Sequence, residues 1–77
     1  MPKQKPLSGL RIIKALTKAG FEIIGRKGSH VRLKKKAIQN VKIVIVPVHP
    51  EIKKGTLKSI LRQSGLTEED LEKLLNE

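Results

Sequence analysis

Hydrophobic residues recur at helical spacing in the first third of the chain. Between Ser8 and Gly20 they return every three or four positions, with basic residues between them. The apolar set comprises Leu10, Ile12, Ile13, Ala15, Leu16 and Ala19. This spacing predicts an amphipathic helix. Ser8 is placed to cap its first turn, and Gly20 is placed to end it.

Three short segments in the middle of the chain are typical of β-strands. They span residues 21–24, 29–35 and 41–46. The first is rich in β-forming residues, the second alternates polar and apolar side chains, and the third is mostly aliphatic. Pro47 ends the third strand, because proline cannot donate to a β-ladder. The connections at residues 25–28 and 35–40 are short, so the strands are expected to form an antiparallel meander.

Alternation predicts which side chains of these strands face the core. The expected inward set is Val31, Leu33, Ile43 and Ile45. The set expected on the opposite, open face is His30, Arg32 and Lys34. On this interpretation, Val44 and Val46 either meet a partner or fill a thin edge of the core.

Two further helices are predicted towards the end of the chain. The first opens at residues 54–56, with Gly55 or Thr56 as its cap, and Gly65 ends it. Thr67 and Asp70 have the spacing of a capping box for the second. The apolar residues of the two helices are Leu57, Ile60 and Leu61, followed by Leu71, Leu74 and Leu75.

This order of elements predicts the fold class. Helices that flank a three-stranded meander must cover one of its faces to bury their apolar stripes. The other face then stays open to solvent or to a partner. We therefore expect an α+β fold with a three-stranded antiparallel sheet and helices on one face.

Length and composition limit what the chain can be. Its 77 residues are expected to form one domain, residues 1–77, with shallow binding sites. The absence of cysteine excludes disulfides and thiolate metal sites, and we expect no metal and no small-molecule cofactor. The sequence has no apolar run of about 18 residues and no signal-like leader. We therefore expect a cytoplasmic protein that does not enter a membrane.

The charge of the chain points to an anionic partner. The net charge is +10, but it is unevenly distributed. Residues 1–67, which open with a basic leader at 1–7, hold sixteen Lys and Arg against two acidic residues, whereas residues 68–77 hold five acidic residues and one Lys. This split predicts a basic body that binds an anion and an acidic C-terminal helix that does not. Phe21 is the one aromatic residue among Phe, Trp and Tyr, so base stacking is nearly excluded and contact with phosphates remains.

His30 is the residue best suited to chemistry on the expected open face. Histidine takes or gives a proton near neutral pH, and RNA carries a 2′-hydroxyl beside each phosphate. A base that removes this proton lets the oxygen attack phosphorus without a metal. Lys27, Arg32 and Lys34 can stabilise the charge that grows on the phosphorane. The residues alone do not establish this role, since a lone histidine is more often an ordinary strand residue.

Two glycine-containing segments are weaker candidates for phosphate binding. Gly25 and Gly28 bound a turn that can cradle a phosphate, but such a turn is more often simple hairpin geometry. The helix start at residues 55–56, with Lys54 and Lys58 nearby, can hold a phosphate through exposed N–H groups or serve only as a cap.

Six motifs stand in order along the chain. They are Ser8-Gly9, Ala19-Gly20-Phe21, Lys27-Gly28-Ser29-His30, Val46-Pro47-Val48-His49, residues 53–61 and Gly65-Leu66-Thr67. This ordered set resembles the HicA family of toxins from bacterial and archaeal toxin–antitoxin pairs.

The resemblance implies a fold, an activity and a partner. The fold is similar to the double-stranded-RNA-binding domain, which agrees with the predicted order of elements. The activity is endoribonuclease cleavage of mRNA, and the catalytic histidine of the Gly-Ser-His motif corresponds to His30. The partner is a HicB-like antitoxin that blocks the active site. We expect RNA to be held by Lys27, Gly28, Ser29, Arg32 and Lys34, with secondary phosphate contacts at Lys54 and Lys58.

Two questions stay open in the sequence. The leaving 5′-oxygen needs a proton, which His49, a lysine or water can supply, although the proline-bounded position of His49 favours a structural or loop role for it. The same fold can also serve as a non-catalytic RNA-binding module that uses the basic sheet face, or as a domain that docks an acidic protein.

Overall fold

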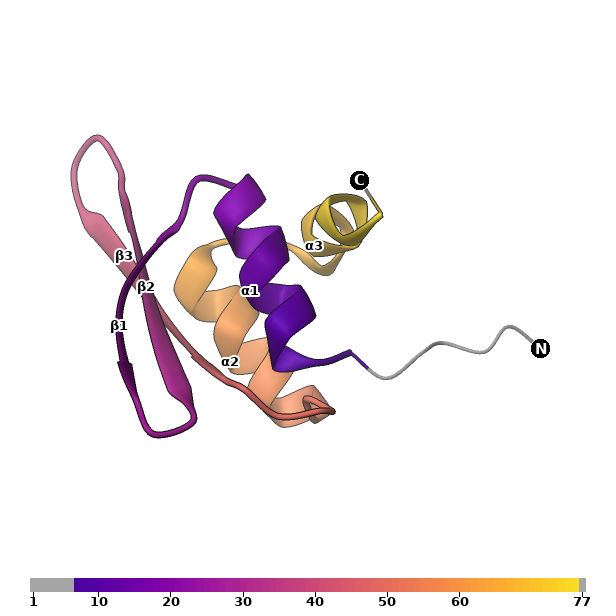
Figure 1. The fold of residues 1–77 in the computed structure, drawn as a ribbon. Helices are drawn as coiled ribbons and strands as arrows, with labels where there is room; N and C mark the ends of the chain where they lie inside the picture. The colour runs from indigo at the N-terminus through magenta and orange to yellow at the C-terminus, as the bar shows by residue number, and fades with distance from the viewer. Residues whose placement is uncertain (1–6, 77) are drawn as a thin grey trace.

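The sheet and the helices form separate layers (Figure 1). The computed structural model describes residues 7–76. The elements are α1 (Gly9–Lys18), β1 (Glu22–Lys27), β2 (His30–Lys36), β3 (Val41–Pro47), α2 (Lys54–Ser64) and α3 (Glu68–Leu75). The strands form one antiparallel sheet in the order β1-β2-β3. Helices α1 and α2 cover one face, and α3 packs on α1 away from the sheet. The expected α+β fold is confirmed, while most of the expected leader, residues 1–6, lies outside the described residues.

Helix α1 begins and ends where its local sequence predicts. The Ser8 hydroxyl accepts a hydrogen bond from the backbone N–H of Arg11 at 3.2 Å. Gly20 follows the helix with a φ of +103°, a conformation that side chains disfavour. Ile12 is fully buried, but Leu10, which we expected in the apolar stripe, is 64% exposed. Leu10 lies roughly 200° around the helix from Ile12 and therefore faces away from the core.

The β1–β2 hairpin is longer and tighter than expected. β1 runs on to Lys27, so the turn is Gly28-Ser29 rather than residues 25–28, and Lys27 pairs with His30. Within the turn, the φ of Gly28 is +60°, whereas no residue of 7–76 other than glycine has a positive φ. A glycine in the first of two turn positions matches the twist of a tight hairpin. Gly25 therefore lies inside β1, beside a register shift, and the turn expected there is wrong.

The buried face of β3 is the opposite of the one expected. Leu33 pairs with Val44, and Val31 pairs with Val46. All four side chains are buried in the main core. Val44 and Val46 are thus central to the core and are available neither to a partner nor at a thin edge.

The open face of β3 is aliphatic. Ile43 and Ile45, expected to be inward, are instead 44% and 43% exposed. Ile43 pairs with Lys34, and Ile45 pairs with Arg32. Because β3 is aliphatic on both faces, its own alternation carried little information, and the pairing with β2 decided which face is buried.

Helix α2 differs from expectation at its start. Its N-cap is Lys53, which makes no side-chain capping bond. Gly55 and Thr56 lie within the first turn, so the cap expected at one of them is wrong. Gly65 ends α2 in the left-handed conformation, with a φ of +77°, as its position predicted.

Helix α3 is attached by a small second core. The predicted capping box is confirmed: the hydroxyl of Thr67 accepts from the N–H of Asp70 at 3.0 Å, and the Asp70 carboxylate accepts from the N–H of Thr67 at 3.2 Å. Leu71 is buried against Ala15 and Leu61. The last helix is therefore anchored on α1 and α2 rather than on the sheet.

Candidate active site

His30 lies at the first position of β2, directly after the Gly28-Ser29 turn. It pairs with Lys27 of β1 on one side and with Pro47 of β3 on the other. Its side chain is exposed. Since His30 stands in the central strand, its backbone position is set by both neighbouring strands.

The connector between β3 and α2 is tied down by backbone hydrogen bonds. The N–H of Val48 donates to the carbonyl of Ser29 at 2.6 Å, and the N–H of Gly9 donates to the carbonyl of His49 at 2.9 Å. Further along, the N–H of Ile52 donates to the carbonyl of Leu7 at 2.8 Å. These bonds hold the connector between the hairpin turn and the start of α1.

The same bonds bring the two histidines together. Ser29 and Val48 are the chain neighbours of His30 and His49, so their hydrogen bond places the two side chains at one end of the sheet. The imidazole centroids are 6.5 Å apart, and the ring planes meet at 68°. The sequence reasoning treated His49 as a residue of uncertain role; the fold makes it the neighbour of His30.

Gly9 allows this arrangement. A Cβ atom at Gly9 would fall on the carbonyl oxygen of Pro47 and within 3.0 Å of the Cα of Val48. Only a residue without a side chain lets the start of α1 approach the connector so closely. This contact explains why glycine follows the capping serine in the Ser8-Gly9 motif.

In the part of the chain that the structure describes, His30 and Ile45 both line two hollows. One is a cleft of about 330 Å³ between the end of β3, the connector and α2. Besides the two shared residues it is lined by Pro47, His49, Ile52, Thr56, Ser59, Ile60 and Gln63. The other has a volume of about 390 Å³, lies on the open sheet face and is lined by Lys27, His30, Arg32 and Ile45.

The structure separates the predicted RNA-binding residues into groups. Lys27 and Arg32 line the sheet-face hollow together with His30. Gly28 and Ser29 form the turn beside them. Lys34 is half-buried, pairs with Glu22 across the sheet, and lines a different hollow further along the hairpin.

Lys54 and Lys58, the expected secondary phosphate contacts, are exposed on α2 but line neither hollow beside His30. Lys58 lies two residues from Thr56, roughly 200° around the helix. It therefore does not share the face of α2 that borders the cleft.

Sequence reasoning missed the polar residues that α2 presents to the cleft. Thr56, Ser59 and Gln63 all line it. The amide oxygen of Gln63 accepts a hydrogen bond from the N–H of Ile45 at 3.0 Å, which satisfies a donor on the outer edge of β3. The sequence contained a signal for this set, because positions 56, 59 and 63 have the three-and-four spacing of one helix face.

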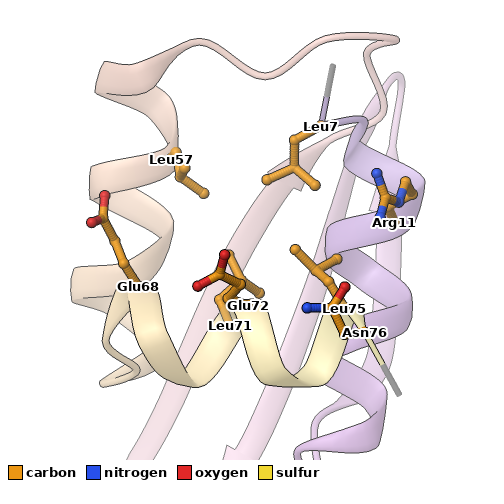
Figure 2. A pocket seen from close by; sticks show the side chains of 8 residues that line it. All are labelled: Leu7, Arg11, Leu57, Glu68, Leu71, Glu72, Leu75 and Asn76. Atoms are coloured by element: carbon orange, nitrogen blue, oxygen red, sulfur yellow. The ribbon is translucent and has the colours of Figure 1, made fainter. Parts of the chain in front are cut away.

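Another hollow lies on the helical side of the molecule, away from the sheet (Figure 2). Its volume is about 400 Å³. The leucine side chains that line it are Leu7, Leu57, Leu71 and Leu75, and its polar lining includes Arg11, Glu68 and Glu72. It shares no residue with the two hollows beside His30.

Residues 7–76 contain neither a cluster of metal-binding side chains nor a helix that could span a membrane. No three His, Cys, Asp or Glu side chains of this part of the chain are grouped so that they could hold a metal ion. No helix in the same range is long and apolar enough to cross a membrane.

Comparison with models of known protein families gives a match. The model of a protein family described as "HicA toxin of bacterial toxin-antitoxin" matches residues 10–66. The matched range runs from α1 to the end of α2 and includes both histidines and both hollows beside them. No curated protein is similar enough to the chain to count as a relative.

Proposed function

Because the chain belongs to the HicA toxin family of bacterial toxin–antitoxin systems, we propose that it is a metal-independent endoribonuclease that cleaves mRNA in the cytoplasm, with His30 as the proton-transfer group. The observation that carries this proposal is the placement of His30. Its exposed imidazole stands at the end of the open sheet face, in one hollow with the cations Lys27 and Arg32.

The proposed reaction begins at the 2′-hydroxyl of the nucleotide before the scissile bond. His30 removes the proton of this hydroxyl, and the oxygen attacks the adjacent phosphorus. Lys27 and Arg32 stabilise the extra negative charge that the phosphorane carries. The P–O5′ bond then breaks, which leaves a 2′,3′-cyclic phosphate on one fragment and a 5′-hydroxyl on the other.

The remaining predicted contacts position the RNA. The exposed hydroxyl of Ser29 in the Gly28-Ser29 turn lies directly beside His30 in the chain and can bind the scissile phosphate. Lys34 lies four residues along β2 from His30, about 13 Å away at the rise of a strand. Lys34, Lys54 and Lys58 are therefore assigned to flanking phosphates rather than to the reacting one.

We further propose that a HicB-like antitoxin inhibits the protein by covering the open sheet face. The exposed Val41, Ile43 and Ile45 form an aliphatic row on β3 beside the basic side chains of β2. Contiguous exposed apolar side chains commonly mark protein interaction sites. A partner that presents apolar and acidic residues would match this surface and bury His30 with it.

A cleavage assay tests the enzymatic proposal. The purified chain should cut single-stranded RNA in the presence of EDTA, and the fragments should end in a cyclic phosphate and a 5′-hydroxyl. His30→Ala should abolish cleavage while the far-UV circular dichroism and the thermal midpoint stay unchanged. A substrate with a single 2′-deoxy nucleotide before the scissile bond should resist cleavage there.

Three results would contradict the proposal. Loss of cleavage in EDTA would exclude the metal-independent route. Cleavage by His30→Ala at the parental rate would remove the catalytic role of His30. Tight RNA binding without cleavage would favour a non-catalytic RNA-binding module on the same sheet face.

Expression in bacteria tests the cellular role. The parent chain should arrest growth and lower mRNA levels, and His30→Ala should do neither. Co-expression of an acidic protein encoded beside the chain should restore growth. If the neighbouring protein binds His30→Ala but does not relieve the arrest caused by the parent, the proposed inhibition is wrong.

A further inference from the structure

The cleft on the α2 side of His30 contains a second imidazole and no other group that readily exchanges a proton. Among the described residues that line this cleft, the side chains other than His30 and His49 are aliphatic, hydroxyl or amide groups. Lys27 and Arg32 line the hollow on the other side of His30. Among the described residues of this cleft, His49 is therefore the group besides His30 that is suited to supply a proton.

Backbone hydrogen bonds fix the position of His49. The peptide carbonyl of His49 is held by Gly9 at 2.9 Å, and the neighbouring Val48 is held by Ser29 at 2.6 Å. These are backbone contacts, so the exposed imidazole of His49 is left available while its backbone is held at both points. Two imidazoles 6.5 Å apart leave space for one phosphate to be approached by both.

The reaction itself needs two proton transfers at opposite sides of one phosphorus atom. The attacking 2′-oxygen loses a proton, and the departing 5′-oxygen must gain one, because an alkoxide is a poor leaving group. Two positioned groups of the same kind, one acting as base and one as acid, meet this demand. The two hollows that flank His30 can each hold one of the two nucleosides that the scissile phosphate joins.

The α2 cleft has the lining that a nucleoside requires. Ile52 and Ile60 supply apolar contact, while the hydroxyls of Thr56 and Ser59 supply hydrogen-bonding groups. Its volume of about 330 Å³ lies within the range of small-molecule pockets. The sheet-face hollow, with Lys27 and Arg32, has instead the charge that a phosphate-bearing nucleotide requires.

The geometry points to His49 as the general acid of the cleavage and to the α2 cleft as the site of the leaving nucleoside, an inference that rests on the proposed ribonuclease function. The nucleotide that carries the attacking 2′-hydroxyl lies over the sheet-face hollow, and the nucleoside that follows the scissile phosphate enters the cleft. The O2′–P bond forms to give the phosphorane, and the P–O5′ bond then breaks. His30 receives the proton of the 2′-hydroxyl, and the imidazolium of His49 gives its proton to the 5′-oxygen.

A sulfur substitution tests this assignment. In a 5′-bridging phosphorothiolate the leaving atom is sulfur, and a thiolate departs without being protonated. On ordinary RNA, His49→Ala should cleave about 10²–10⁴-fold more slowly than the parent, the usual contribution of a general acid. On the phosphorothiolate substrate, His49→Ala should cleave within roughly tenfold of the parent, whereas His30→Ala should remain inactive on both substrates.

Two controls keep the test decisive. His49→Gln retains a polar side chain of similar length and should repeat the His49→Ala pattern, and circular dichroism of both variants should match the parent because the contacts of His49 to α1 are made by its backbone. Gln63→Ala changes the cleft without removing an imidazole and should affect the two substrates equally.

The outcomes separate the two proposals. Equal defects of His49→Ala on both substrates, or parental cleavage of ordinary RNA by His49→Ala, would overturn the role of His49 and leave the ribonuclease function standing. A parent that cleaves neither substrate would overturn the ribonuclease function and this inference with it.

Discussion

The two sides of the molecule differ in both charge and chemistry. The sheet side carries His30, Lys27 and Arg32, with His49 at its edge. The helical side carries a leucine-lined groove whose polar lining includes Glu68 and Glu72 (Figure 2). An RNA backbone is attracted by the first side and repelled by the acidic residues of the second. The comparison shows how a chain of 77 residues separates the surface proposed to bind RNA from the surface that anchors its last helix.

The largest expected difference between the two sides is in stability. Leu33 is fully buried between the sheet and the helices, whereas Leu71 is buried in the smaller cluster under α3. Leu33→Ala should lower the free energy of unfolding by an amount in the upper half of the usual range of about 2–5 kcal/mol, and Leu71→Ala by an amount in the lower half. Urea denaturation measures both.

The same pair of variants tests whether the helical side is needed for function. Leu71→Ala should retain RNA cleavage per folded molecule, because α3 touches neither hollow beside His30. An equal loss of stability in the two variants, or a loss of cleavage by folded Leu71→Ala, would show that the two sides are not separable.

A smaller effect on stability is expected where α1 supports the site. Gly9→Ala should cost about 1–3 kcal/mol, because the added methyl group meets the carbonyl of Pro47. Gly55→Ala is the matched control: this glycine also lies in the first turn of a helix, but its Cβ would meet no atom within 4 Å. We expect Gly55→Ala to be neutral or stabilising. Thermal unfolding of both variants would show whether close approach, rather than helix propensity, selects glycine at position 9.

The next effect is on RNA affinity. Arg32→Ala should weaken binding of a non-cleavable 2′-deoxy substrate by roughly tenfold at moderate salt, the effect of removing one charged phosphate contact. The slope of log affinity against log salt should also decrease by about 0.7. Arg62→Ala removes the same charge from an exposed position of α2 that lines neither hollow and should change affinity far less. Equal effects would mean that the net charge, and not the sheet face, holds the RNA.

The smallest effect is expected on the acidic side. Glu72→Gln should change RNA affinity by less than about twofold, because α3 lies beyond α1 from the sheet and its charge is screened over roughly 10 Å at 0.1 M salt. Glu22→Gln, opposite Lys34 on the sheet, should increase affinity more. Fluorescence anisotropy at several salt concentrations would measure the RNA affinities of the two variants. A larger effect of Glu72→Gln than of Glu22→Gln would place RNA on the helical side.

Features that depend on neighbouring residues were predictable from the sequence. The Ser8 cap, the glycines that end α1 and α2, and the Thr67–Asp70 capping box all form as expected. Each is governed by contacts within a single helix turn. Leu10 was misplaced by the same reasoning, because an apolar residue at the start of a helix does not need to face the core.

The buried face of β3 shows where local patterns stop being informative. Ile43 and Ile45 were expected inward from alternation, yet Val44 and Val46 are buried. In an antiparallel hairpin, a loop with an even number of residues pairs odd-numbered with even-numbered positions. The loop at residues 37–40 has four residues, so Leu33 must share a face with Val44. The strand bounds expected from the sequence, 29–35 and 41–46, leave five residues between them, an odd number that would pair Leu33 with Ile43. Only the structure, in which β2 extends to Lys36, gives the four-residue loop and the observed pairing.

The sequence by itself determined the helices, the meander, the basic body and the acidic last helix, because these follow from spacing and charge along the chain. Alternation along β2 also placed His30 and Arg32 on one face, whereas Lys27 joins them only because the turn is Gly28-Ser29 rather than residues 25–28. Only the tertiary structure decided that His49 stands 6.5 Å from His30. That proximity depends on backbone hydrogen bonds between segments far apart in sequence. Such bonds involve no side chains, so no pattern of residue types along the chain predicts them.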